Sequence, residues 1–164
     1  MEFNYKAIGF IKSPHKEAKG TPIQTGAAID IEGEVRVLSK FKEGLKDLDG
    51  FSHIILLYHC HKAGEYKLLR KPFMDNNEHG IFSIRAPSRP NPIGFSVVRL
   101  LSIKDNIIKI KDVDILDGTP VLDIKPYVKE FDVKEVTKQG WLDQNVHKMQ
   151  NKKDDGRFLD KKDD

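Results

Sequence analysis

Residues 95–115 read FSVVRLLSIKDNIIKIKDVDI (Phe95–Ile115) and contain two apolar runs separated by a polar break. In both runs apolar residues recur at roughly every second position, which is typical of β-strands. Lys104-Asp105-Asn106 forms the break, so the two runs are predicted to pair as an antiparallel hairpin. This stretch favours a β-rich fold built from antiparallel strands.

Segments on either side carry the same strand pattern. Asp117-Gly118-Thr119-Pro120 separates the second run from the next one and predicts another hairpin, because Asp-Gly is a strong turn signal. Many short strands with few helices predict a mainly β fold, a single antiparallel domain curled into a barrel. The further predicted strands are Tyr5–Lys12, Ala28–Leu38 with a bulge or bend at Gly33, Phe51–His61 with apolar residues on both faces, and Val121–Val128.

Helical spacing is confined to a few short segments. Phe41, Leu45 and Leu48 follow it, and so does a C-terminal pattern that begins at Leu142. A weak helix is also predicted for Gly64–Lys71. We expect residues 1–140 to form the barrel domain and residues 141–164 to form a C-terminal helix and a tail, loose from residue 152.

Composition limits the functional classes. The 164 residues carry a formal charge of +3, and the single cysteine excludes an intrachain disulfide. No apolar run approaches the roughly 20 residues of a membrane helix, and the first residues do not resemble a signal peptide, so a cytoplasmic protein is expected. Residues 80–104 contain four basic side chains and no acid, which points to this stretch for an anionic ligand.

Two local patterns resemble chemical sites. His59-Cys60-His61 resembles a metal-ligand triplet, but on a strand Cys60 points away from both imidazoles, so no metal is predicted. The second pattern, Arg85–Gly94 (RAPSRPNPIG), holds three prolines that predict a rigid loop. Its arginines suit a carboxylate or phosphate, although a solvent-exposed crossover explains the composition equally well.

Several segments together resemble one family. Gly80–Ser96 is similar to the signature of the TsaA-like family, also called the TrmO family. Ile8–Pro14, Phe51-Ser52-His53 and Asp117–Tyr127 match other blocks of that family, so the resemblance covers about Ile8 to Tyr127. It is closest to short members, which lack a further C-terminal domain.

The resemblance implies a small β-barrel that binds S-adenosylmethionine, commonly as a homodimer with the cofactor near the interface. Characterised members methylate the exocyclic N6 amine of threonylcarbamoyl-adenosine, next to the anticodon in tRNA. A cofactor-binding module without methyl transfer, or a methyltransferase with another RNA or small-molecule acceptor, remains an alternative.

The family's binding residues are carried over by position, and no catalytic residue is assigned. Substrate contacts are expected at Arg89, Asn91, Lys125 and Tyr127. The expected cofactor contacts are Thr25, Gly26, Ala27, His61, Lys62, Arg85, Phe95, Asp114, Ile115, Leu116 and Asp117.

Overall fold

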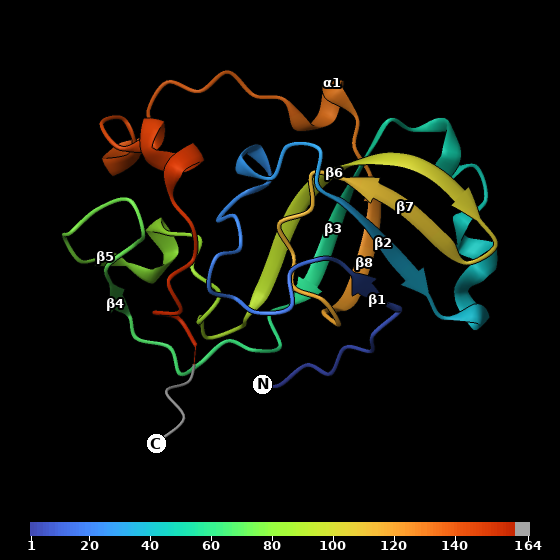
Figure 1. Cartoon of the computed structure of the whole chain (residues 1–164), viewed down its shortest axis with the longest axis horizontal. Helices are drawn as coiled ribbons and strands as arrows, with labels where there is room; N and C mark the ends of the chain where they lie inside the picture. Colours follow the sequence, from blue (N-terminus) through green and yellow to red (C-terminus); the bar gives the residue numbers. More distant parts are fainter. Residues whose placement is uncertain (160–164) are drawn as a thin grey trace.

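A computed structural model, which describes residues 1–159, contains a closed six-stranded antiparallel barrel with a small two-stranded sheet beside it (Figure 1). The barrel strands are hydrogen-bonded in the order β1-β2-β7-β6-β3-β8, and β8 closes the ring on β1. The predicted mainly β class and barrel architecture are confirmed. The strands are β1 Gly9–Lys12, β2 Glu32–Val37, β3 His53–His59, β4 Leu69–Arg70, β5 His79–Gly80, β6 Ile93–Lys104, β7 Ile107–Lys111 and β8 Pro120–Pro126.

Alternating apolar side chains fill the barrel interior. Ile54 and Leu56 of β3 and Val98 of β6 are fully buried, and the register pairs Ile54 with Val98. Burying such a side chain contributes about 1.5–3 kcal/mol, so this interior is the main source of stability. The core residues are Ile11, Val35, Val37, Ile54, Leu56, Val98, Ile108, Ile110, Val113, Ile115 and Val121.

Three strands begin later than predicted, and one of them, β3, starts at His53 rather than at Phe51. The first starts at Gly9, and the side chain of Tyr5 is exposed. The second starts two residues after Asp30, whose left-handed backbone (φ 63°) interrupts an extended chain. The predicted bulge at Gly33 is wrong, because β2 and β7 pair through it without a register shift. A Cβ there would lie 2.9 Å from the carbonyl oxygen of Lys12, so close packing explains this glycine.

The hairpin formed by β6 and β7 is confirmed, whereas the second predicted hairpin is wrong. Strand β7 ends at Lys111, and Asp112 adopts a left-handed conformation (φ 68°) that turns the chain away. Strand β8 pairs with β1 and β3 instead. The Asp-Gly turn is bound to β1, since the Gly118 amide donates to the carbonyl oxygen of Ile11 at 2.8 Å. The β7–β8 connection is therefore a loop rather than a hairpin turn.

The predicted helical segments are shorter than expected. Residues 39–50 form two 3₁₀ helices, and the end of the predicted helix 64–71 is strand β4. No helix among residues 1–159 is both long enough and apolar enough to cross a membrane. The helices are α1 Lys129–Asp132 and the 3₁₀ helices Thr25–Ala27, Ser39–Leu45, Leu48–Gly50, Ile81–Ser83, Gly140–Leu142 and Val146–Asn151.

The C-terminal segment, which comprises residues 133–159, is packed against the rest of the chain. After α1 it crosses to the side of the molecule where β4 and β5 lie (Figure 1). Phe158 is only 2% exposed and forms a second apolar cluster with Ile81, Ile84 and Ala86. The predicted loose tail is therefore wrong for residues 152–159, and the remainder of that prediction lies outside the described residues.

Candidate active site

A cavity of about 580 Å³ lies where β3 ends and β6 begins. The β7–β8 connection, residues 82–89 and the C-terminal segment supply other walls. Its size is typical of a small-molecule site. Its polar and aromatic lining residues are Thr21, Gln24, Tyr58, Cys60, His61, Lys62, Phe73, Phe82, Arg85, Arg89, Phe95, Asp114, Thr119, Asp154 and Phe158.

The proline-rich loop forms one wall of this cavity. Arg89 donates from Nη1 to the carbonyl oxygens of Ile81 at 3.0 Å and Ile84 at 2.7 Å. The amide of Cys60 donates to the carbonyl oxygen of Pro92 at 2.8 Å, which joins the loop to the end of β3. The loop is therefore fixed by its own arginine as well as by its prolines.

Arg85, the other arginine of the loop, lines the cavity, and most of its N–H groups form no hydrogen bond within residues 1–159. Arg85 is exposed, and its Nη1 donates to Oε1 of Gln24 at 3.1 Å. Within residues 1–159 it forms no ion pair. A guanidinium in this position suits a carboxylate or phosphate, since its planar fork matches either group.

Arg99, also in the acid-free stretch, is not available for a ligand. Its Nε and Nη2 lie 2.6 Å from carboxylate oxygens of Asp112 and Asp30, respectively. The expectation that an anion binds residues 80–104 therefore depends on the loop arginines and on Lys104, which lies at the far end of β6.

Three polar side chains form a hydrogen-bonded chain on the barrel side of the cavity. The Tyr58 hydroxyl lies 3.1 Å from Oγ of the buried Ser96, which in turn donates to Oδ1 of Asp114 at 2.8 Å. Burial raises the pKa of Asp114 to about 6 and raises the pKa of Tyr58 above its usual value. The cavity thus contains a carboxyl group with a pKa of about 6, well above that of an ordinary aspartate.

Gly94 creates the space that Tyr58 occupies. The two residues face each other in the register of β3 and β6. A Cβ at position 94 would lie 2.0 Å from Cε2 of the tyrosine ring. The glycine that ends the proline-rich motif is therefore a steric requirement of the Tyr58–Ser96–Asp114 chain.

The chain beyond β3 brings a thiol and an imidazole to the cavity. Burial raises the pKa of Cys60 to about 11, which keeps the thiol protonated and a poor nucleophile. Burial also lowers the pKa of His61, whose Nδ1 lies 3.3 Å from Oγ1 of Thr119. In the described part of the chain, no three His, Cys, Asp or Glu residues are grouped to hold a metal ion.

The cavity brings together many of the predicted binding residues. They come from the end of β3, the proline-rich loop, the start of β6 and the β7–β8 connection. Arg89 is among them, although its Nη1 is already engaged by main-chain carbonyls. The predicted residues that line the cavity are His61, Lys62, Arg85, Arg89, Phe95, Asp114, Ile115 and Leu116.

The predicted cofactor residues Thr25, Gly26 and Ala27 do not line this cavity. They form the 3₁₀ turn that follows Gln24, and a Cβ on Gly26 would lie 3.0 Å from Cε of Met149. Asp117 lies outside as well. Hydrogen bonds from Lys16, at 2.7 Å, and from the Ser13 amide hold its pKa below the usual value. All four stay predictions.

Three predicted substrate residues also lie outside the cavity lining. Asn91 is exposed on the proline-rich loop. Lys125 pairs with Asp123 at 2.7 Å, and the Tyr127 ring lies 6.1 Å from that of His53, at the opposite end of β3 from the cavity. Their assignment to the substrate also stays a prediction.

Sequence reasoning missed Tyr58, Ser96 and Asp154. The period-two pattern could have revealed the first two, because it places both hydroxyls on the same strand face as the apolar residues of the barrel interior. No comparable signal marks Asp154, which reaches the cavity from the C-terminal segment. Its carboxylate accepts a hydrogen bond from the Gly156 amide at 2.7 Å, and burial raises its pKa.

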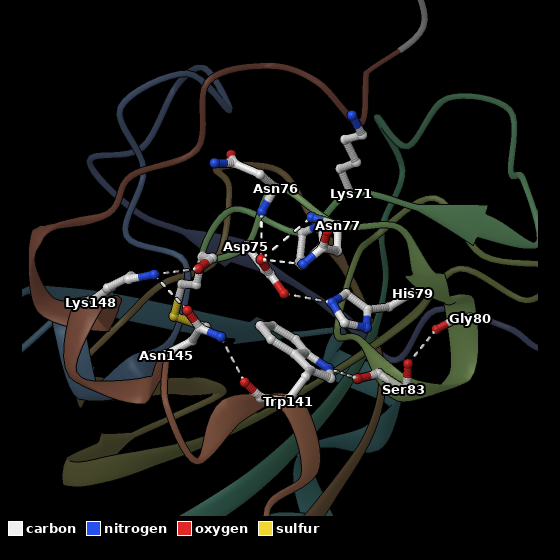
Figure 2. A network of polar contacts seen from close by, with 12 residues as sticks. Lys71, Asp75, Asn76, Asn77, His79, Gly80, Ser83, Trp141, Asn145 and Lys148 are labelled. Atoms are coloured by element: carbon white, nitrogen blue, oxygen red, sulfur yellow. Dashed lines mark hydrogen bonds and ion pairs between the residues drawn. The ribbon is translucent and has the colours of Figure 1, made fainter.

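A second groove, of about 360 Å³, lies beside the cavity, and the C-terminal segment forms one of its sides. Figure 2 shows how this segment is held: the Trp141 and His79 rings stack at 4.8 Å, and Trp141 Nε1 donates to the carbonyl oxygen of Ser83 at 2.8 Å. His79 in turn lies 2.8 Å from Oδ2 of Asp75. These contacts fix residues that border both hollows.

The chain is similar to proteins named for S-adenosylmethionine binding. It is 61% identical over 155 residues to a probable S-adenosyl-L-methionine-binding protein of Pyrococcus abyssi, covering 94% of this chain and 84% of that protein. It is 37% identical over 136 residues to the tRNA (adenine(37)-N6)-methyltransferase of Escherichia coli, covering 77% of this chain and 58% of that enzyme.

Comparison with solved structures gives the same assignment. The crystal structure of TrmO from Pseudomonas aeruginosa matches with a TM-score of 0.72 and 36% identity, covering 86% of this chain and 63% of that one. The chain therefore spans less than two thirds of that protein and of the E. coli enzyme. The sequence-family model of the tRNA-methyltransferase O N-terminal domain matches residues 10–133. The predicted family is confirmed, and the chain belongs to the tRNA-methyltransferase O (TrmO) family.

Proposed function

We propose that this chain binds S-adenosylmethionine in the cavity at the end of the barrel and transfers its methyl group to an adenine N6 amine of tRNA. The finer proposal is that the acceptor is threonylcarbamoyl-adenosine next to the anticodon. One observation carries the assignment: in this TrmO-family chain, Arg85, Phe95 and Asp114 all line the same cavity. The names of the E. coli and P. abyssi relatives support it.

The residues of the cavity fit the cofactor in charge and in size. Arg85 has donors available for the methionine carboxylate, and Phe95 offers an aromatic face to the adenine or to a cation. Asp114 offers a negative charge to the cationic part of the molecule. When bound, the cofactor supplies a methyl group activated by a sulfonium, so no acid catalyst is required.

The main contribution of the protein to rate is positioning. Arg85 and Phe95 hold their ligand on two sides, while the proline-rich loop keeps Arg85 in place. A stiff wall of this kind places the reacting atoms in line and reduces the ordering that must occur during reaction. Cys60 stays protonated, so it does not compete as a methyl acceptor. No general base is assigned.

We also propose a cytoplasmic homodimer with the cofactor near the subunit interface. Support comes from exposed apolar side chains that line the cavity, namely Phe82 at 78%, Phe95 at 51% and Ile93 at 44% exposure. Such a patch is typical of an interaction surface. Light scattering during gel filtration should give twice the monomer mass, and Phe82→Asp should shift it toward the monomer; a monomeric wild type would contradict the proposal.

The activity is tested with labelled S-adenosylmethionine and tRNA that contains or lacks threonylcarbamoyl-adenosine, followed by mass spectrometry of the nucleosides. The expected product is methylated threonylcarbamoyl-adenosine, formed only with the modified tRNA. Protein that binds the cofactor but methylates neither tRNA would contradict the assignment.

A second candidate is a cofactor-binding module without methyl transfer. It is favoured by the name of the P. abyssi relative, which mentions binding only. Tight cofactor binding, without a methylated product among RNAs and small molecules, would support it. A methylated product on another acceptor would mean that the protein is a methyltransferase with a different substrate.

A further inference from the structure

Asp114 differs from its neighbours in having no cationic partner within residues 1–159. Asp112 is bound by Arg99, and Asp117 is bound by Lys16. Asp114 accepts a hydrogen bond from Ser96 and lines the cavity, without an ion pair. An ionised carboxylate that is withdrawn from water is costly unless a positive charge compensates it. The geometry therefore leaves a place for a cation of the ligand.

The groups that face Asp114 favour a particular kind of cation. Tyr58 approaches from β3 and Cys60 from the residue after its end, and both are neutral because burial raises the pKa of each. Arg85 acts on Asp114 only through its field, since its hydrogen bond goes to Gln24. An ammonium needs acceptors for its three N–H groups, whereas the Tyr58 and Ser96 hydroxyls are already joined by hydrogen bonds to each other and to Asp114. A sulfonium has no N–H groups to satisfy, so it fits this position better.

We propose that Asp114 is the counter-ion of the cofactor's sulfonium, and that it makes the site hold the charged methyl donor more tightly than the neutral product. The inference rests on the proposed function. In the transfer, the bond between the methyl carbon and sulfur breaks, and its electron pair stays on sulfur. The methyl carbon bonds to N6 of the acceptor, and the N6 proton leaves to solvent. Asp114 then faces an uncharged thioether, which favours product release.

This arrangement couples donor binding to the protonation of Asp114. Burial raises the pKa of the carboxyl to about 6 in the free protein, and a nearby positive charge lowers the pKa again. Near that pH, binding of S-adenosylmethionine should release a proton. Binding of S-adenosylhomocysteine, which lacks the sulfonium, should not do so at this residue. By reciprocity, the affinity for the donor rises with pH through this range.

The second carboxylate of the cavity supplies a matched control. Asp154 also lines the cavity, and its main-chain amide donates to the carbonyl oxygen of Thr21 at 2.9 Å. In this proposal Asp154 faces the α-ammonium group, which donor and product share. Asp154→Asn should therefore weaken both ligands equally, whereas Asp114→Asn should weaken only the donor.

The test is isothermal titration of the full chain with S-adenosylmethionine and S-adenosylhomocysteine, in buffers of different ionisation enthalpy. At about pH 7 the wild type should prefer the donor by roughly tenfold or more, and the preference should shrink toward one near pH 5. Asp114→Asn should abolish the preference while keeping product affinity within about threefold, and Asp154→Asn should retain the preference. Circular dichroism checks that each variant is folded.

Each failure has its own signature. Equal wild-type affinities for the two ligands at neutral pH would overturn the counter-ion while leaving cofactor binding intact. So would a preference that survives in Asp114→Asn, or one that is lost in Asp154→Asn instead. A wild type that binds neither ligand would overturn the proposed function and this inference together.

Discussion

Asp114 affects stability and binding in opposite directions. Its carboxyl group has a pKa of about 6 in the folded chain because it is buried, against 3.8 for the ordinary group. A raised pKa in the folded state favours folding at low pH, and this contribution is lost as pH rises through 6. In the free protein, the ionised Asp114 is therefore unfavourable at neutral pH.

Asp114→Asn should consequently stabilise the ligand-free protein. We expect the free energy of unfolding at neutral pH to rise by about 1–3 kcal/mol, with a much smaller gain near pH 4. Urea unfolding at both pH values measures it. Asp117→Asn is the opposite control: the Lys16 hydrogen bond lowers the pKa of Asp117, so its loss should reduce stability at neutral pH. A destabilised Asp114→Asn at neutral pH would contradict the assigned burial.

Replacing the two arginines of the proline-rich loop should affect different properties, namely cofactor affinity for Arg85 and stability for Arg89. Arg85→Ala should weaken S-adenosylmethionine binding by about 1–3 kcal/mol and leave the melting temperature unchanged. Arg89→Ala removes the donor from the Ile81 and Ile84 carbonyls, so it should lower the free energy of unfolding by about 1–3 kcal/mol. Titration calorimetry and thermal melting separate the two effects, and unchanged affinity in Arg85→Ala would remove Arg85 from the binding site.

Gly94→Ala tests the packing of Tyr58. The new methyl group would overlap the tyrosine ring, so we expect a loss of about 1–3 kcal/mol in unfolding free energy. In a Tyr58→Ala background the same change should cost much less, because the clashing ring is gone. Chemical denaturation of the four proteins completes this cycle. Equal costs in both backgrounds would show that the ring is not the obstacle.

At the scale of elements, the C-terminal segment is a structural part of the site. Trp141→Ala removes the stack on His79 and the hydrogen bond to Ser83, and we expect it to lower the unfolding free energy by about 2 kcal/mol. Phe131 on α1 is 72% exposed, so Phe131→Ala should cost under about 0.5 kcal/mol. Urea unfolding compares the two variants. A similar small loss in both would mean that the segment is only loosely attached.

Strand positions could be predicted because the period-two pattern is local to each strand. Pairing partners could not be predicted to the same extent. The β6–β7 hairpin was predicted correctly from its short polar turn, but the next turn signal was misleading. Asp112 turns the chain first, and β8 gains more by closing the barrel on β1 and β3. That choice depends on residues more than 60 positions apart, which no local pattern encodes.

At the scale of the whole molecule, the site could likewise be predicted only where its residues belong to a local pattern. The proline-rich loop was predicted to be rigid and to offer arginines to an anionic ligand, and Arg85 of this loop lines the cavity. Asp154 and Phe158 were missed, because they reach the cavity only when the C-terminal segment packs against residues distant in the sequence, such as Ile81 and Ile84. Ser96 was not recognised as a site residue because it lies within a mostly apolar run, although the alternation of the strand predicts that its side chain points inward.

The central claim is that the cavity beside the proline-rich loop is the S-adenosylmethionine site. A crystal structure of the protein grown with saturating S-adenosylmethionine tests it most directly. The account predicts ligand density between Arg85, Phe95 and Asp114, with the sulfur on the Asp114 side. Density confined to the second groove beside Trp141, or no density in the cavity, would contradict it.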